Sequence, residues 1–340
     1  MTQTQQLADS TLEEAVSWLS LSEVSPHSQL EDLIQDEFRP HLESHQRITR
    51  LEADDPYFQP ARELWKRNGW DGEGLSNFIG LLCGILNFPA ILLLNPSEWD
   101  NLPWNDMIRE SPTLSWLQRT LEPLGLTLRD IIIIDVFPLL TNTRMDAMGA
   151  QEKQRVTNEV FNLTINFLRH FKPPVIISCQ CATRGSHGRW GIVDNPLALS
   201  LCSSVDGARR QEVASMSVDE HRIRVVQAFH PMKILYEENL GARSEYDQVL
   251  RSILETVYRP CSAWRNRHRQ ECEENLHSAA EEIRSTMRAF LDSITKYHRV
   301  QRRAITFGIG TAQMRSPVVS NWEGLRADVR SFVANMLPEV

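Results

Sequence analysis

Short apolar runs alternate with amphipathic stretches through the middle of the chain. Four runs have the length and the β-branched content of strands: 90–94, 131–134, 175–178 and 223–229. They show little alternation, which is typical of strands that are buried on both faces of a parallel sheet. Helical stretches lie between them, the clearest at 111–124 and 151–171. This order predicts an α/β fold, a three-layer α/β/α sandwich with a short, mainly parallel sheet.

Two further regions flank the predicted sheet. Residues 1–59 are rich in Asp and Glu, which predicts an acidic N-terminal extension that is partly helical or disordered. Residues 60–260 are then the α/β domain, and residues 261–340 a helical C-terminal extension. A solvated helix face explains the charges between residues 266 and 298 better than a nucleic-acid groove does. A dimerising or phosphate-contacting helix is the alternative.

Composition limits the functions that are open to the chain. Its 340 residues carry a net charge of −8, which argues against tight binding to nucleic acid by the protein alone. No run of eighteen apolar residues and no secretory signal occur, so we expect an intracellular protein of the nucleus or cytoplasm, with no membrane partner. The six cysteines show no CxxC spacing, so we predict reduced thiols, no metal site and no cofactor.

Candidate chemistry lies where the apolar runs end, because ligands of open parallel sheets bind at the carboxyl ends of the strands. Asn95-Pro96 follows the first run, Asp135 the second and His230-Pro231 the fourth. A proline fixes the backbone of the residue before it and so holds that side chain in one direction. The simpler interpretation is that each Pro only ends a strand.

The order and spacing of these motifs resemble the uracil-DNA glycosylase-like superfamily. The resemblance covers residues 90–235 and rests on Asn-Pro after the first run, IIIIDVFPLLTNTR, FKPPVIISCQCATR and VVQAFHPMKI. It implies hydrolysis of the N-glycosidic bond of a nucleobase, either in DNA, as in DNA repair, or in a nucleoside-like compound.

The resemblance also assigns roles to individual residues. Asn95 matches the residue that positions the attacking water, and His230 matches the histidine that stabilises the departing base. Asp135 occupies the place of the residue that recognises the edge of the base, with Asn142 as a nearby competitor for that role.

Three further residues complete the expected site. Trp99 or Phe137 would supply the aromatic surface on which the base stacks. Pro96 would bind substrate as part of the first motif.

Several positions depart from the family pattern. Leu93 and Ser97 stand where the family has glycines, which would narrow the pocket. Asp135 replaces an asparagine, and an ionised carboxylate only accepts hydrogen bonds. We therefore expect uracil to be recognised poorly and a ring that presents donors to be preferred. Met232 replaces a small polar residue after the histidine.

Three hypotheses remain. The chain is a divergent N-glycosidic-bond hydrolase, or it is a non-catalytic nucleobase- or nucleic-acid-binding protein that retains the fold. A third possibility is an unrelated α/β enzyme with similar strand ends. Geometry separates the first two from the third, because either of them requires Asn95, Asp135 and His230 to line one cleft.

Overall fold

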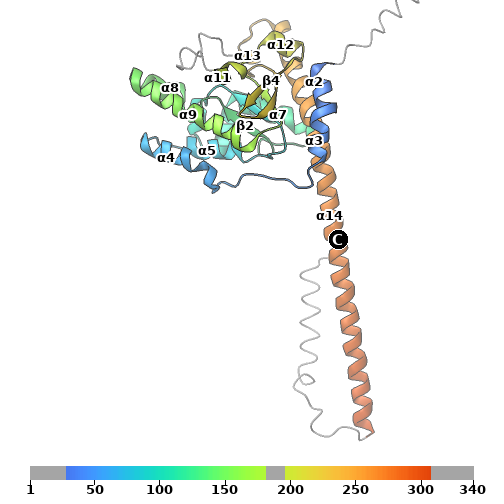
Figure 1. Cartoon of the computed structure of the whole chain (residues 1–340). Coiled ribbons are helices and arrows are strands. Elements are labelled where there is room, and N and C mark those ends of the chain that lie inside the picture. The colour runs from blue at the N-terminus through green and yellow to red at the C-terminus, as the bar shows by residue number, and fades with distance from the viewer. Residues whose placement is uncertain (1–27, 181–195, 308–340) are drawn as a thin grey trace, which may run out of the picture. The chain divides into compact units, whose positions relative to one another are not determined.

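The computed structural model describes residues 28–180 and 196–307 (Figure 1). Five strands form one sheet: β1 (Ala90–Leu93), β2 (Ile132–Asp135), β3 (Val175–Ser178), β4 (Val213–Val218) and β5 (His221–Gln227). Their order across the sheet is β2-β1-β3-β5-β4. The first four strands in this order are mutually parallel, and β4 pairs with β5 antiparallel. The prediction of an α/β fold with a short, mainly parallel sheet is confirmed.

The sheet lies between two hydrophobic cores, so the domain has three layers. Successive side chains of a strand point to opposite faces. Accordingly Ile91 and Ile133 belong to one core, while Leu92 and Ile134 belong to the other. All eight residues of β1 and β2 are buried, which explains why these strands appear in the sequence as continuous apolar runs.

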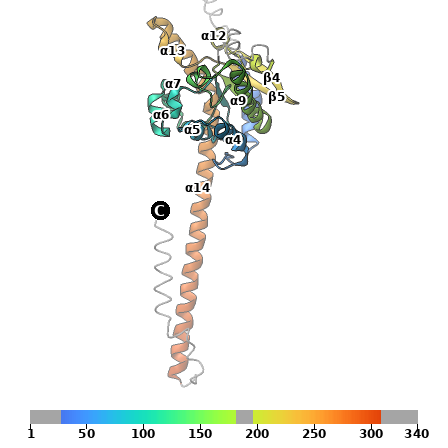
Figure 2. The same cartoon turned by 90° about the vertical axis from the view of Figure 1, so that its left-hand side faces the viewer.

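Helices cover both faces (Figures 1 and 2). The first core receives side chains from α2 (Gln29–Asp32), a π-helical turn η1 (Leu33–Phe38), α3 (Arg39–Glu43), α6 (Trp104–Glu110), α7 (Pro112–Leu121) and the start of α14 (Leu240–Thr306). The second receives them mainly from α4 (Gln59–Arg67), α5 (Gly74–Leu82), α8 (Asn142–Asp146), α9 (Ala150–Phe171) and α11 (Pro196–Ser200). Shorter elements are η2 (Pro56–Phe58), η3 (Glu98–Asn101), η4 (Glu122–Leu124), α12 (Val205–Arg209) and α13 (Met232–Tyr236).

The segment before residue 60 packs into both cores: residues 30–42 enter the first core, and Leu51 and Phe58 enter the second. Ser28 forms a capping box with Glu31 at the start of α2. Leu30, Leu33, Ile34, Phe38 and Leu42 follow at helical spacing and are all at most 2% exposed. This part of the predicted acidic extension therefore contributes to the α/β domain, and residues 1–27 lie outside the described residues.

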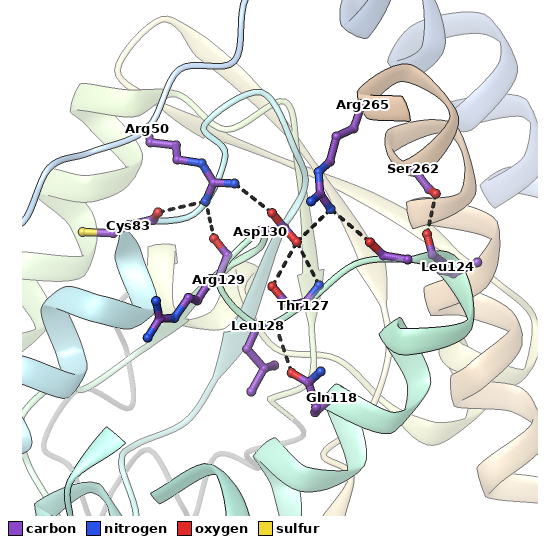
Figure 3. A network of polar contacts seen from close by, with 11 residues as sticks. Arg50, Cys83, Gln118, Leu124, Thr127, Leu128, Arg129, Asp130, Ser262 and Arg265 are labelled. Atoms are coloured by element: carbon purple, nitrogen blue, oxygen red, sulfur yellow. Dashed lines mark hydrogen bonds and ion pairs between the residues drawn. The ribbon is translucent and has the colours of Figure 1, made fainter. Parts of the chain in front are cut away.

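A buried carboxylate joins three distant parts of the chain (Figure 3). Asp130, just before β2, is bound by Arg50 at 2.8 Å and by Arg265 of α14 at 2.9 Å. It also accepts hydrogen bonds from the backbone and side chain of Thr127. The two guanidinium groups and these hydrogen bonds hold the pKa of Asp130 below its usual value, because they stabilise its ionised form.

The chain from Leu240 to Thr306 forms a single helix, α14. The chain forms two compact units, Met1–Arg265 and Asn266–Val340. In the first unit, Tyr258 of α14 is fully buried and donates a hydrogen bond to the carbonyl of Pro89 at 2.9 Å, just before β1. Within the described residues, none of the helices has the length and apolar character needed to cross a membrane.

Candidate functional site

The connections of β1 and β2 create a crevice at one edge of the sheet. The chain after β1 enters α6 and α7 on the first face, while the chain after β2 enters α8 and α9 on the second. In the order β2-β1-β3-β5, β1 connects to β2 on one side and β3 connects onward on the other, so the strand order reverses between β1 and β3. Ligands of α/β sheets bind at such a topological switch point. Leu93 and Asp135 lie side by side in the register at this edge.

A pocket of about 470 Å³ lies at this crevice. It is lined by most of the predicted site residues: Asn95, Pro96, Trp99, Asp135, Asn142 and His230. Asn95, Asp135 and His230 come from the ends of three different strands and meet in one cleft. Parallel sheets in general collect strand ends at one edge, so this convergence supports a ligand site and does not by itself indicate one family.

Phe137 is the predicted site residue that does not line the pocket. Its backbone N–H donates to the carbonyl of Leu94 at 2.9 Å, which continues the pairing of β1 with β2. Its ring is fully buried in the second core, 6.0 Å from the ring of Phe161 in α9. The expectation that Phe137 stacks on a base is therefore wrong, and Trp99, which is 45% exposed, is the aromatic residue of the predicted pair in the pocket wall.

Asp135 is a buried carboxyl group. It is 8% exposed, and its Oδ1 atom has no hydrogen-bond partner among the described residues. Thr164 of α9 donates to its backbone carbonyl at 2.7 Å and fixes the end of β2. Burial raises the pKa of Asp135 well above its usual value, and the negative charge of Asp100 adds to this rise.

The expectation that Asp135 only accepts hydrogen bonds applies to its ionised form, whereas the raised pKa favours the protonated form. A carboxylic acid that keeps its proton donates through its hydroxyl and accepts through its carbonyl oxygen. In this respect a protonated Asp135 resembles the amide of asparagine more closely than an ionised carboxylate does.

His230 follows β5 and presents a defined tautomer. Its Nδ1 atom accepts a hydrogen bond from the backbone N–H of Met232 at 3.2 Å, so the proton of the neutral ring lies on Nε2. Burial lowers the pKa of His230 to about 4, which keeps the ring neutral at physiological pH. The side chain therefore offers a single N–H donor from Nε2.

Asn95 contributes an oxygen acceptor. Its Nδ2 atom donates to the carbonyl of Pro96 at 3.1 Å, which engages the amide nitrogen locally. Oδ1 is then the atom of this side chain that can accept a hydrogen bond from water or a ligand. Asn142, by contrast, lies on the exposed rim at the start of α8.

The loop after Asn95 is fixed by polar contacts. Ser97 and Asp100 form a capping box at η3, and the buried side chain of Asn77 donates to the carbonyls of Asp100 and Leu102, each at 2.7 Å. Asp100 also lines the pocket, a role that the sequence analysis missed. The signal was the capping-box spacing between Ser97 and Asp100.

Other hollows among the described residues are weaker candidates for a ligand site than the pocket at the ends of β1, β2 and β5. Three larger hollows, about 550, 740 and 810 Å³, lie elsewhere in the first compact unit, but their lining includes none of the buried side-chain atoms that lack a hydrogen-bond partner. No group of three His, Cys, Asp or Glu among the described residues could hold a metal ion. No protein-family model and no curated protein sequence matches the chain.

Proposed function

We propose that the pocket at the ends of β1, β2 and β5 binds a nucleobase in DNA or in a nucleoside-like compound and hydrolyses the N-glycosidic bond between that base and its sugar. The resemblance to the uracil-DNA glycosylase-like superfamily suggests this reaction. The observation that carries the proposal is that Asn95, Asp135 and His230 line one pocket, each with hydrogen-bonding groups that suit a step of the hydrolysis.

Each step has a residue to support it. The C–N bond breaks with its electron pair on the base, and the oxygen of water adds to the sugar carbon. Nε2–H of His230 stabilises the negative charge that develops on the base. Oδ1 of Asn95 accepts a hydrogen bond from the attacking water and positions it. Asparagine is not a general base, so the water proton passes to the departing base or to solvent after attack.

The protonation of Asp135 bears on the substrate. A carboxylic acid complements a ring edge with an adjacent N–H and C=O, because its carbonyl accepts from the N–H while its hydroxyl donates to the oxygen. Uracil and hypoxanthine have such an edge. We therefore propose these uncharged lactam rings as substrates, in place of the donor-presenting ring that an ionised Asp135 would favour.

The charge of the site favours a small substrate over DNA. No Lys or Arg is among the described residues that line the pocket, and the whole chain carries a net charge of −8. Contacts to phosphates need clustered basic side chains and make binding steeply dependent on salt. We expect binding of a free nucleoside to change little with salt concentration, whereas binding to an oligonucleotide through its phosphates would weaken strongly.

The test is release of base from uracil- and hypoxanthine-containing nucleosides and from oligonucleotides that carry the same bases. His230→Ala should lower the rate about 10²–10³-fold, because it removes a donor to the developing charge, and Asn95→Ala should also lower it. His277→Ala removes an exposed histidine of α14 and is the matched control, with an unchanged rate. Release that persists at the full rate in His230→Ala would contradict the proposed mechanism.

The second candidate is a nucleobase-binding protein without hydrolysis. Leu93, which stands where the family has glycine, lines the pocket and is 7% exposed, so it reduces the space for a sugar beside the base. If the protein only binds nucleobases, calorimetry should detect binding of free uracil or hypoxanthine, and Asp135→Ala should abolish this binding. No base should then be released from nucleosides or oligonucleotides. If neither ligand binds and no base is released, both functions are wrong.

A further inference from the structure

The second compact unit carries a row of exposed apolar side chains. Leu276, Ile283, Phe290 and Tyr297 are spaced at seven residues along α14 and are 73%, 52%, 49% and 65% exposed. Large apolar side chains are seldom left in water in such a regular row. A seven-residue apolar repeat is the pattern by which one helix packs against another.

Four smaller side chains complete the row. Ala279, Thr286, Ser293 and Val300 lie between or beside the large ones, at alternating spacings of three and four residues, and all are at least partly exposed. We call these eight residues the seam. None of them is charged, whereas ionised side chains occupy much of the rest of the helix. The seam is thus a continuous strip suited to knobs-into-holes packing.

Acidic and basic side chains occupy different halves of this part of α14. Residues 271–282 contain five Glu and no Lys or Arg, while residues 284–303 contain six Lys or Arg and one Asp. A parallel partner would place acidic beside acidic and basic beside basic. An antiparallel copy places each half beside the opposite charge, which is favourable.

We propose that the seam binds the seam of a second copy of this chain in antiparallel orientation. In the register that aligns the two charged halves, every layer joins a larger side chain to a smaller one: Leu276 with Val300, Tyr297 with Ala279, Ile283 with Ser293, and Phe290 with Thr286. Each layer occurs twice because of the two-fold symmetry. The same register places Glu282 beside Lys296 of the second copy, at the edge of the seam.

Charge reversal tests both association and orientation. Sedimentation of the full chain over a range of concentrations should show a dimer. Glu282→Lys and Lys296→Glu should each raise the dimer Kd at least tenfold, because each places like charges together, and the double variant should restore it. Glu281→Lys makes the same charge change on the opposite side of the helix from the seam and should leave the Kd unchanged. A wild-type chain that stays monomeric, or a double variant weaker than both singles, overturns the proposal.

Cross-linking gives an independent measure of the register. Cys272 is exposed, and the proposed register places it beside Ala304 of the second copy. Ala304→Cys should therefore form an interchain disulfide with Cys272 under mild oxidation, whereas the wild-type chain should not cross-link through Cys272. Cross-linking of wild-type Cys272 to its own equivalent would indicate a parallel dimer and overturn the proposal.

The chain's own C-terminal residues are the rival occupant. Val318, Trp322, Leu325, Val329 and Phe332 also have spacings of four and three residues. If the full chain is a monomer and a chain ending at residue 307 is a dimer, the seam binds this segment and the proposed dimer is wrong. A dimer formed equally well by both chains supports the proposal. Neither outcome depends on nucleobase binding.

Discussion

Replacing Asp135 by Asn should change how the stability of the protein depends on pH. In the folded protein, burial raises the pKa of Asp135 well above its usual value of 3.8. Above that usual value, the unfolded chain has lost this proton while the folded protein still holds it. The folded state then binds more protons than the unfolded state, so stability falls as pH rises. The slope for one proton is about 1.4 kcal/mol per pH unit.

His230 acts in the opposite direction over part of this range. Its folded pKa of about 4 lies below the usual 6.5, so between these values the unfolded chain binds the extra proton and stability falls as pH falls. The full contribution is about 3 kcal/mol. In the wild-type protein the two slopes oppose each other between about pH 4 and 6.5, for as long as the folded Asp135 keeps its proton.

The difference between Asp135→Asn and wild type isolates the aspartate. The asparagine side chain of the variant has nearly the same shape and does not ionise, so the contributions of His230 and of the other groups cancel. As the pH rises above the usual pKa of 3.8, the variant should gain stability relative to wild type at about 1.4 kcal/mol per pH unit, until the folded pKa of Asp135 is reached.

Urea unfolding at half-unit pH steps and constant ionic strength measures this difference. Asp54→Asn, which removes an exposed carboxylate, is the matched control, and its effect should not change over the same range. A difference between Asp135→Asn and wild type that stays constant from pH 5 to 8 would refute the reasoning. Asp135 would then be ionised in the folded protein, and it could not donate a hydrogen bond to a ligand.

Three further predictions concern residues that stabilise the α/β domain away from the candidate site. Asp130→Asn should lower the free energy of unfolding by roughly 2–4 kcal/mol in urea, because it leaves two guanidinium groups without their carboxylate. Glu245→Gln is the control: it breaks an exposed ion pair and should lower the same free energy by less than about 1 kcal/mol. Gly84→Ala should prevent soluble expression or lower the melting temperature sharply, since a Cβ atom there would lie 2.4 Å from the backbone of Ile131; a variant with the wild-type melting temperature would contradict this packing. Lys172→Gly should raise the free energy of unfolding by about 1 kcal/mol, because Lys172 ends α9 with a φ of 47°, a backbone conformation that glycine adopts more easily than lysine. A loss of stability would show that the lysine side chain makes a compensating contact.

Much of the sheet could be predicted from the sequence, because its strands are buried on both faces. The runs at 90–94, 131–134 and 175–178 match β1, β2 and β3 to within one residue. The strand β4 escaped prediction. It lies at the edge of the sheet, and only Met216 and Val218 in it are buried, so it lacks a continuous apolar run.

The candidate site was predictable as a set of positions and less so as chemistry. Asn95, Asp135 and His230 could be identified because they follow predicted strands, and parallel strands bring their carboxyl ends to one edge of the sheet. The protonation of Asp135 and the tautomer of His230 depend on burial and on one backbone N–H, neither of which a sequence pattern contains. Phe137 was misassigned because its position next to a strand end cannot show which core its ring enters.

The arrangement around Asp130 determines where the α/β domain can be cut. Arg50 and Arg265 bind the same carboxylate from positions far apart in the chain (Figure 3). A recombinant fragment that begins at residue 60 or ends before residue 265 removes at least one of them and leaves a buried charge short of a partner. A fragment that keeps both arginines, such as one covering residues 28–265, is therefore the one to express for crystallisation or ligand screening.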